Sequence, residues 1–438
     1  MLLSRLIRSL ARTMESDDDV RRGRATRFPP AGAAGALQDR DTARHAGERA
    51  TDAVVILDLG RRYRQSLGST VQAARAQGVR VLRDEHALAA LRRPGEPRAR
   101  RVVYISRTWA QAAALLPTLR SPTALTFVTV LPHCVALGDK HSMALLLSAP
   151  PGRERQCCPP TIVLDELGRD SLSAHDDRGA ALVPRKWYAK PTGGSMGRGV
   201  RVVGPMTRHA AVMWARRKRG DGGRGAKTTV LQAEVAPPLL HRAKRVKFDA
   251  RFVCLVRHDG TCSVFPDARL RFGCRAHSAH DTSRHANVLN EALQSRLRMR
   301  PDDRTWVLAF PQRLSRVTDE VDRPPPPFPA APEPIGPHLV SAAQEMLTSA
   351  LQRILLARPS AAAQLRAFNG QLSRAGTVAG ADAVGAVGLL GCDVAFDADG
   401  RPWLLEVNVL PMEYHAPAES VRLYGEIGSW IWRELSTR

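Results

Sequence analysis

Two polar residues lie inside an apolar stretch near the end of the chain. In the sequence WLLEVNV, Glu406 and Asn408 interrupt residues that are otherwise apolar. Residues two apart in a strand point to the same face, so the carboxylate and the amide would lie side by side. Burying such groups without a compensating partner is costly. The pattern therefore favours a ligand for this pair, and an edge strand with both groups facing water is the alternative.

A third candidate ligand, Asp393, lies on the preceding apolar stretch LLGCDVAF, and the turn sequence DADG separates the two stretches. If the two strands pair antiparallel about this turn, Asp393 and Glu406 come side by side. Two carboxylates and an amide oxygen suit Mg²⁺ held against substrate phosphates. We predict a magnesium site formed by Asp393, Glu406 and Asn408.

A glycine-rich loop follows a short apolar strand, WYAK, that ends at Lys190. Glycines let the backbone approach a phosphate closely and offer N–H donors, and a lysine on the preceding strand adds a positive charge. The sequence GxxxxGK[ST] is absent, so this loop is not a P-loop. A phosphate-binding loop and a plain hairpin turn both remain open. The loop residues concerned are Gly193, Gly194, Ser195, Gly197 and Gly199.

The charge of the chain is strongly positive. There are 65 Lys and Arg residues against 42 Asp and Glu residues, which gives a formal net charge of +23. Such a field favours a polyanionic partner, although the arginines are spread along the whole chain and could reflect biased composition alone. We expect no nucleic-acid partner, because only 5% of residues are aromatic and no zinc-finger pattern occurs.

Cysteine usage and hydropathy indicate the compartment. Seven cysteines without a CxxC pair argue against a disulfide framework or a zinc site and favour a reducing environment. No apolar run approaches the ~20 residues that span a bilayer, so we expect no transmembrane segment. The N-terminal sequence MLLSRLIRSLARTM is amphipathic and free of acidic residues, so a mitochondrial presequence is an alternative to a helical arm.

The order of expected elements indicates an α/β (α+β) protein of several lobes. Strands alternate with helical patterns between residues 51 and 150, which predicts an N-terminal α/β lobe. Residues 1–50 are charged and lack an apolar period, so we predict a disordered arm. Beyond residue 150 we expect a central lobe at 151–240 and a C-terminal lobe at 241–438. The C-terminal lobe would contain a proline-rich insert at 322–337.

Four motifs in order resemble the tubulin–tyrosine ligase-like family. They are KWYAKPTGGSMGRGV, TVLQAEVAPPLL, KFDARFVCLV and LLGCDVAFDADGRPWLLEVN, within residues 130–435. The resemblance implies an ATP-grasp fold with mixed-sheet central and C-terminal lobes. It also implies a carboxylate–amine ligase that uses ATP and Mg²⁺ to join a free amino acid to a tubulin tail through an acyl phosphate. In such a reaction cations neutralise the transferring phosphoryl oxygens.

The resemblance assigns roles residue by residue. The magnesium ligands would be the three residues named above. The nucleotide would be bound by the glycine loop and by Lys140, Lys190, the hinge Gln232, Ala233, Glu234 and Val235, and Asn287. The catalytic set would be Lys247, Asp249, Arg251 and Arg271, with the two arginines offering forks for a carboxylate or phosphate. Surface charges for the arginines, and a plain Lys247–Asp249 ion pair, are the alternatives.

Departures from the family pattern lie around the hinge and the acceptor side. The sequence QAEV replaces the usual Q-x-Y-I, so the hinge lacks its aromatic residue, and the segment RHANVLN is shorter than its family counterpart. We expect a divergent ligase of the cytoplasm and cytoskeleton, or of a ciliary axoneme. The expected amino acid is glutamate, and glycine and tyrosine remain open. A ligase for a non-tubulin or small-molecule substrate, and a microtubule-binding pseudoenzyme, are the rival interpretations.

Overall fold

Parallel strands form the first part of a ten-stranded sheet and, with the helix between them, agree with the α/β arrangement predicted for residues 51–150. Their order is β2-β1-β3-β4, with parallel pairing throughout. These strands are β1 (Ala53–Asp58), β2 (Arg80–Arg83), β3 (Arg101–Ser106) and β4 (Ala124–Val128). Helix α2 (Gly68–Ala76) connects β1 to β2. Strand β3 is apolar and buried almost throughout, as expected for a parallel strand covered on both faces.

The computed structural model describes most of the chain from β1 onward, and residues 51–438 form one compact unit. The predicted arm at 1–50, and residues 323–334 of the proline-rich insert, lie outside the described residues. The described residues are 53–58, 67–83, 101–106, 124–147, 157–164, 183–191, 199–220, 229–241, 245–289, 313–317, 321–322, 335–356, 359–379, 383–409, 411 and 418–436.

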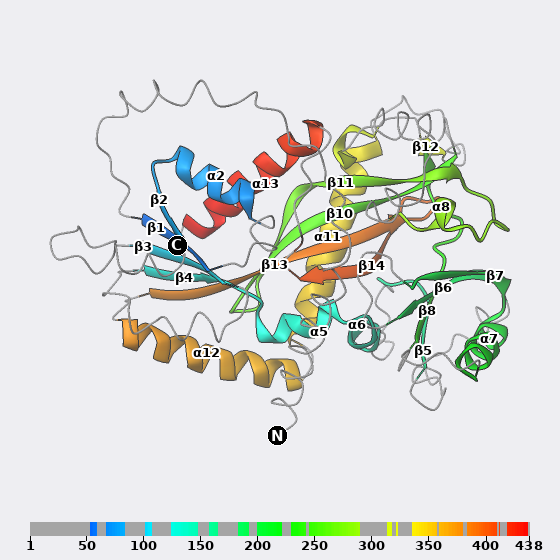
Figure 1. The fold of residues 1–438 in the computed structure, drawn as a ribbon, viewed down its shortest axis with the longest axis horizontal. Helices are drawn as coiled ribbons and strands as arrows, with labels where there is room; N and C mark the ends of the chain where they lie inside the picture. The colour runs from blue at the N-terminus through cyan, green and yellow to red at the C-terminus, as the bar shows by residue number, and fades with distance from the viewer. Residues whose placement is uncertain are drawn as a thin grey trace, which may run out of the picture. The chain divides into compact units, whose positions relative to one another are not determined.

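Strand β13 (Ala383–Phe396) joins the parallel strands to an antiparallel part of the same sheet (Figure 1). It pairs parallel with β4 and antiparallel with β10 (Val246–Arg257) and β14 (Pro402–Val409). Strand β11 (Cys262–Ala276) then pairs antiparallel with β10. The two-residue strands β9 (Leu240–His241) and β12 (Val321–Asp322) extend the sheet beyond β10. One sheet thus contains strands from the predicted N-terminal and C-terminal lobes, whose boundaries stay a prediction.

A second, four-stranded antiparallel sheet has the order β5-β8-β6-β7. Its strands are β5 (Thr161–Leu164), β6 (Arg185–Pro191), β7 (Arg201–Met206) and β8 (Thr229–Ala233). Helix α7 (Arg208–Gly220) covers one face, where Ala211 and Ala215 pack with Trp187 and Val203. Since side chains alternate along a strand, Lys186, Tyr188 and Lys190 of β6 lie on the opposite face.

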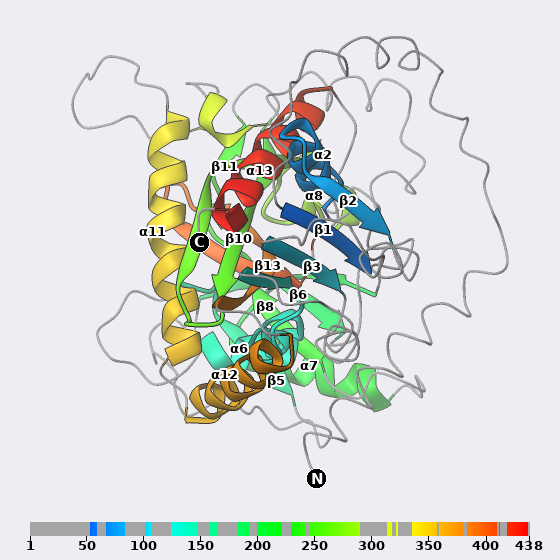
Figure 2. The ribbon, with the colours of Figure 1, turned by 90° about the vertical axis from the view of Figure 1, so that its left-hand side faces the viewer.

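Helices cover both faces of the large sheet. Helix α11 (Ile335–Leu356) packs its predicted apolar stripe, including Leu339, Ala343 and Leu347, into the core cluster that contains Phe252 and Cys254. Helix α13 (Ala418–Ser436) packs on α2 and joins the cluster of the other face of β10, which contains Val253. Figure 2 shows α11 and α13 on opposite sides of β10 and β13. Helices α12 (Pro359–Ala379) and α13 had no counterpart among the predicted elements.

The described part of the chain contains no helix long and apolar enough to cross a membrane. All seven cysteines have free thiols in the structure. The fold is therefore a mixed α/β arrangement in which one sheet is mixed parallel and antiparallel and the other is antiparallel. The short helix α5 (Val135–Gly138) precedes α6 (Lys140–Leu147). Helices α6 and α8 (Arg284–Asn287) contribute Lys140 and Asn287 to the cavity described next.

Candidate nucleotide and metal site

A cavity lies between the two sheets and is lined by most of the predicted site residues. It encloses about 970 Å³ of atom-free space, including the part open to solvent. Its charged lining residues are Lys140, Lys190, Lys247, Asp249, Arg271, Asp393 and Glu406. Its apolar lining includes Val200, Val235, Pro238, Phe248, Val288, Leu289, Ala395 and Phe396. A ligand with both an apolar ring and anionic groups would match this lining.

The strand register brings the three predicted metal ligands together. Asp393 of β13 stands directly opposite Glu406 of β14, which confirms the antiparallel pairing predicted about the DADG turn. Directly opposed residues project to the same face of a sheet. The Asn408 amide also donates a hydrogen bond to Asp393, with 3.4 Å between Nδ2 and Oδ2. The same row continues into β10, because Arg251 is the other cross-strand partner of Asp393.

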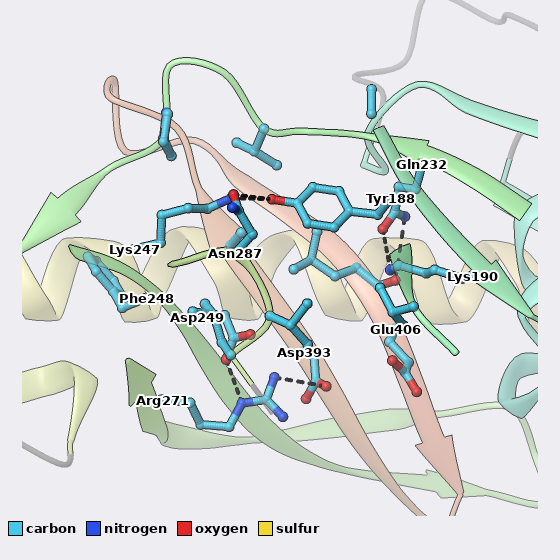
Figure 3. Close-up of a pocket in the computed structure, with 18 of the residues that line it drawn as sticks. Tyr188, Lys190, Gln232, Lys247, Phe248, Asp249, Arg271, Asn287, Asp393 and Glu406 are labelled. Carbon is cyan, nitrogen blue, oxygen red and sulfur yellow. Dashed lines mark hydrogen bonds and ion pairs between the residues drawn. The ribbon is translucent and has the colours of Figure 1, made fainter. Parts of the chain in front are cut away.

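Two arginines hold the Asp393 carboxylate (Figure 3 shows the Arg271 contact). Arg251 donates from Nε to Oδ1 at 2.8 Å and from Nη2 to Oδ2 at 2.9 Å. Arg271 Nη2 lies 2.9 Å from Oδ2, while its Nε donates to Asp249 Oδ1 at 2.5 Å. Burial alone would raise the pKa of Asp393, but the charges and hydrogen bonds of Arg251 and Arg271 lower it to about 2. Asp393 is therefore ionised at neutral pH.

Two lysines reach the same cavity from separate elements. Lys140 begins helix α6, where Asp139 Oδ1 accepts the Ser142 N–H as an N-cap, and its Nζ lies 3.4 Å from Glu406 Oε1. Lys190 of β6 donates to Gln232 Oε1 at 2.6 Å. Burial lowers the pKa of Lys190 although Glu406 opposes this. Both ammonium groups therefore lie where they could neutralise an anionic ligand of the cavity.

The glycine loop is only partly described. Strands β6 and β7 pair antiparallel, which confirms the strand–loop–strand prediction. Gly199 has φ +72° and a Cβ there would lie 3.0 Å from Pro191 Cγ, so this position favours glycine. The predicted phosphate contacts of Gly193, Gly194, Ser195 and Gly197 lie outside the described residues.

The hinge residue Glu234 is part of a buried cluster. The Glu234 carboxylate lies 3.2 Å from Lys186 Nζ and 2.9 Å from Lys247 Nζ. The backbone N–H of Glu234 donates to the Lys186 carbonyl. Lys247 also donates to the Tyr188 hydroxyl at 2.6 Å, and Lys186 donates to Asn287 Oδ1 at 3.0 Å. We call Lys186, Tyr188, Glu234, Lys247 and Asn287 the Glu234 cluster. Of the hinge residues, Gln232, Ala233 and Val235 line the cavity.

The cluster changes the electrostatics of its members. Burial raises and Lys247 lowers the pKa of Glu234, with a net lowering. The pKa of Lys247 is raised, because Tyr188 and Glu234 outweigh its burial. Burial and Lys247 lower the pKa of the neighbouring His277 to about 4, so His277 is neutral at neutral pH. The Lys247–Asp249 ion pair considered from sequence is wrong for the described side chains, because each has another partner.

Sequence reasoning missed Lys186, Tyr188 and His277. The signal for the first two was present, because Lys186, Tyr188 and Lys190 alternate with apolar residues in the sequence KWYAK. A period of two predicts one polar face, and that face borders the cavity. His277 carried no such pattern, since it follows the last residue of β11. The predicted residues Arg251 and Asn408 contact Asp393, and Asn287 lines the cavity.

The donor set bears on whether Mg²⁺ would fit. In the described part of the chain, no group of three or more His, Cys, Asp or Glu side chains could hold a metal ion. The predicted site offers two carboxylates and an amide, and Mg²⁺ commonly takes one or two carboxylates together with substrate phosphates and water. The residues therefore fit Mg²⁺ arriving with a phosphate better than a metal held by protein alone. No protein-family model and no curated protein matches this chain, and the family resemblance stays a prediction.

Proposed function

We propose that this protein is an ATP- and Mg²⁺-dependent ligase that adds an amino acid, with glutamate as the first candidate, to tubulin tails. One observation carries the proposal. Lys140 and Lys190 share a cavity with Asp393 and Glu406, which the strand register places directly opposite each other, and Mg²⁺ bound to these carboxylates would offset their repulsion of an incoming phosphate. Enzymes that bind a nucleoside triphosphate use lysines and carboxylate-bound metal ions to neutralise its phosphates.

The remaining lining supports a nucleotide as the ligand. Lys190 and Lys140 would neutralise phosphate oxygens, and the apolar residues Val235, Phe248 and Phe396 would bury a flat base. Gln232 accepts a hydrogen bond from Lys190 and donates to the Leu405 carbonyl at 3.5 Å. This side chain therefore fixes the Lys190 ammonium between β8 and β14. When bound, Mg²⁺ would supply neutralisation of the triphosphate charge at Asp393, Glu406 and Asn408.

The arginines suit the acceptor half of the proposed reaction. Arg251 and Arg271 both contact Asp393, so their guanidinium groups lie beside the proposed metal ligands. Planar forks of this kind bind carboxylates and phosphates in two-point contacts. Arg251 and Arg271 already contact Asp393 and Asp249, and their positive charge would attract a substrate carboxylate toward the terminal phosphate and stabilise the resulting acyl phosphate before an amine attacks it. The net charge of +23 would attract an acidic tail.

Nucleotide binding is the first test. Titration calorimetry with ATP and Mg²⁺ should give saturable binding that Lys190→Met weakens by roughly tenfold or more, since a charge-assisted phosphate contact is lost. Arg201→Met is the control, because it removes one positive charge from an exposed position on the neighbouring strand β7. Equal affinities for the two variants would remove Lys190 from the proposed site.

Incorporation of labelled glutamate, glycine and tyrosine into purified microtubules tests the ligase step. Incorporation of one amino acid, abolished by Glu406→Gln, would establish the donor and the role of Glu406. ATP binding without any incorporation would favour the ligase with a different acceptor. Microtubule binding without ATP binding would overturn the ligase proposal and favour the pseudoenzyme.

A further inference from the structure

Two adjacent cysteines lie in a short segment that bridges the two sheets beside the cavity. The segment Cys157–Pro160 reads CCPP. The Cys157 carbonyl accepts a hydrogen bond from the Leu404 N–H of β14 at 2.7 Å. The Pro160 carbonyl accepts one from the Ala233 N–H of β8 at 2.8 Å. A change of backbone conformation within this segment would therefore alter its hydrogen bonds to both sheets.

The two thiols have different neighbours. Both are reduced and buried, with 7% of Cys157 and 8% of Cys158 exposed. Cys158 lines a small cavity that also contacts Lys140, Lys190 and Gln232, all of which line the main cavity as well. Cys157 is instead close enough to Arg353 of α11, and to Arg401 in the β13–β14 turn, to feel their charges. Only a small oxidant could reach thiols that are buried to this extent.

These neighbours make the pair asymmetric. The hydrogen bond from Cys158 and the charges of Arg353 and Arg401 outweigh burial and lower the pKa of Cys157 to about 7. The same hydrogen bond and burial raise the pKa of Cys158. A substantial fraction of Cys157 is therefore ionised at neutral pH, whereas Cys158 stays a thiol, and this difference suits an attacking and a resolving cysteine.

We propose that Cys157 and Cys158 form a redox-active vicinal dithiol that a hydroperoxide oxidises to a disulfide. The Cys157 thiolate attacks the terminal peroxide oxygen, forming an S–O bond as the O–O bond breaks. The departing alkoxide or hydroxide takes up a proton, leaving a sulfenic acid at Cys157. Cys158 then attacks this sulfur, forming the S–S bond and releasing water. In total, two thiols lose two electrons and two protons, and the hydroperoxide is reduced to an alcohol, or water, plus water.

The disulfide would be labile and would disturb the segment. Neighbouring Cα atoms across a trans peptide are about 3.8 Å apart, whereas disulfides usually span about 4.4–6.8 Å. A vicinal disulfide is therefore strained and more easily reduced by a dithiol. The backbone adjustment would shift the contacts to Leu404 and Ala233 and, with them, Lys190. The resulting loss of ATP affinity rests on the proposed function, whereas the oxidation itself does not.

Peptide mass measurement tests the oxidation on the full chain. Reduced protein is treated with hydrogen peroxide at pH 7, quenched, and digested with trypsin without reduction. Trypsin cleaves after Arg155 and Arg169, and the peptide of residues 156–169 that it releases contains both thiols. This peptide should lose the mass of two hydrogens and regain it with dithiothreitol. Cys254 and Cys392, whose sulfur atoms lie 3.7 Å apart, provide an internal comparison. Earlier oxidation of that pair would overturn the proposal.

Three variants separate the roles of the thiols. Cys157→Ser should slow peroxide consumption at this site on the order of tenfold or more, because the thiolate is lost. Cys158→Ser should leave a sulfenic acid at Cys157 that dimedone traps, and Cys274→Ser, in β11, should behave as wild type. Unchanged oxidation of Cys157→Ser, or no dimedone adduct in Cys158→Ser, would overturn the assignment.

ATP titration of the oxidised protein tests the coupling separately. A fall in ATP affinity that dithiothreitol reverses would support it. A disulfide that forms without any change in affinity would overturn the coupling and leave the redox site standing. Reduced protein that binds no ATP would count against the proposed function, not against the dithiol.

Discussion

At the scale of single residues, the site contains two buried charge networks that differ in their ratio of positive to negative side chains. Around Asp393, two arginines face two carboxylates, Asp393 and Asp249. In the Glu234 cluster, Lys186 and Lys247 share one carboxylate. Since an unpaired buried charge costs more than a buried pair contributes, the single carboxylate of the second network is the member whose loss matters most.

Glu234→Gln should lower the free energy of unfolding by about 3–5 kcal/mol, because it leaves two buried ammonium groups facing a neutral amide. Lys247→Met should cost less, since Glu234 keeps Lys186 as its partner at 3.2 Å and the methionine stem fills the same space. Urea-induced unfolding of both variants and the wild type measures the order. Equal losses, or a larger loss for Lys247→Met, would show that the carboxylate does not hold this cluster together.

At the scale of elements, local patterns predicted well and distant pairings did not. The turn DADG correctly placed Asp393 beside Glu406, because a short connection fixes the register of an antiparallel pair. Asp393 also pairs with Arg251, which is 142 positions away in the sequence. Charge and strand pattern alone gave no means to pair Arg251 with Asp393, or to reject a Lys247–Asp249 ion pair. The contacts within the Glu234 cluster could not be predicted for the same reason, because its members are far apart in the sequence and come from both sheets.

Helix α13 packs so closely on α2 that adding one methyl group at their contact should destabilise the protein. A Cβ at Gly428 would lie 2.6 Å from the Ser69 carbonyl oxygen, which is backbone and cannot turn aside. Gly428→Ala should therefore destabilise the protein by about 1–3 kcal/mol through overpacking. Gly425→Ala is the matched control on the same helix, with nothing within 4 Å of its added Cβ. It should be neutral or stabilise by up to about 1 kcal/mol.

Thermal unfolding of the two alanine variants gives the measurement. A midpoint that falls for Gly428→Ala and holds or rises for Gly425→Ala would match the described packing. A similar change in both would mean that α13 does not approach α2 as closely as the structure shows. The Trp432 indole of α13 donates to Gln77 Oε1 at 2.9 Å, which adds a contact to the residue that directly follows α2.

At the scale of the whole unit, β13 makes residues 51–150 depend on the end of the chain. Strand β4 pairs on one side with β3 and on the other with β13. One apolar cluster contains Leu67 and Val103 from the first part together with Leu423 and Trp430 from α13. The sequence pattern correctly indicated an α/β arrangement here, but the period of a strand does not reveal which distant strand completes its pairing.

A fragment of residues 51–150 should consequently fail to fold alone. Its β4 edge would lack the pairing that β13 provides, and α2 would lose the covering helix α13. We expect narrow amide dispersion in its NMR spectrum and no cooperative thermal transition, whereas residues 51–438 should unfold cooperatively. A dispersed spectrum for the fragment would instead support an autonomous N-terminal lobe ending near residue 150. The pairing with β13 would then be docking between two folded lobes, and not a condition for folding the first.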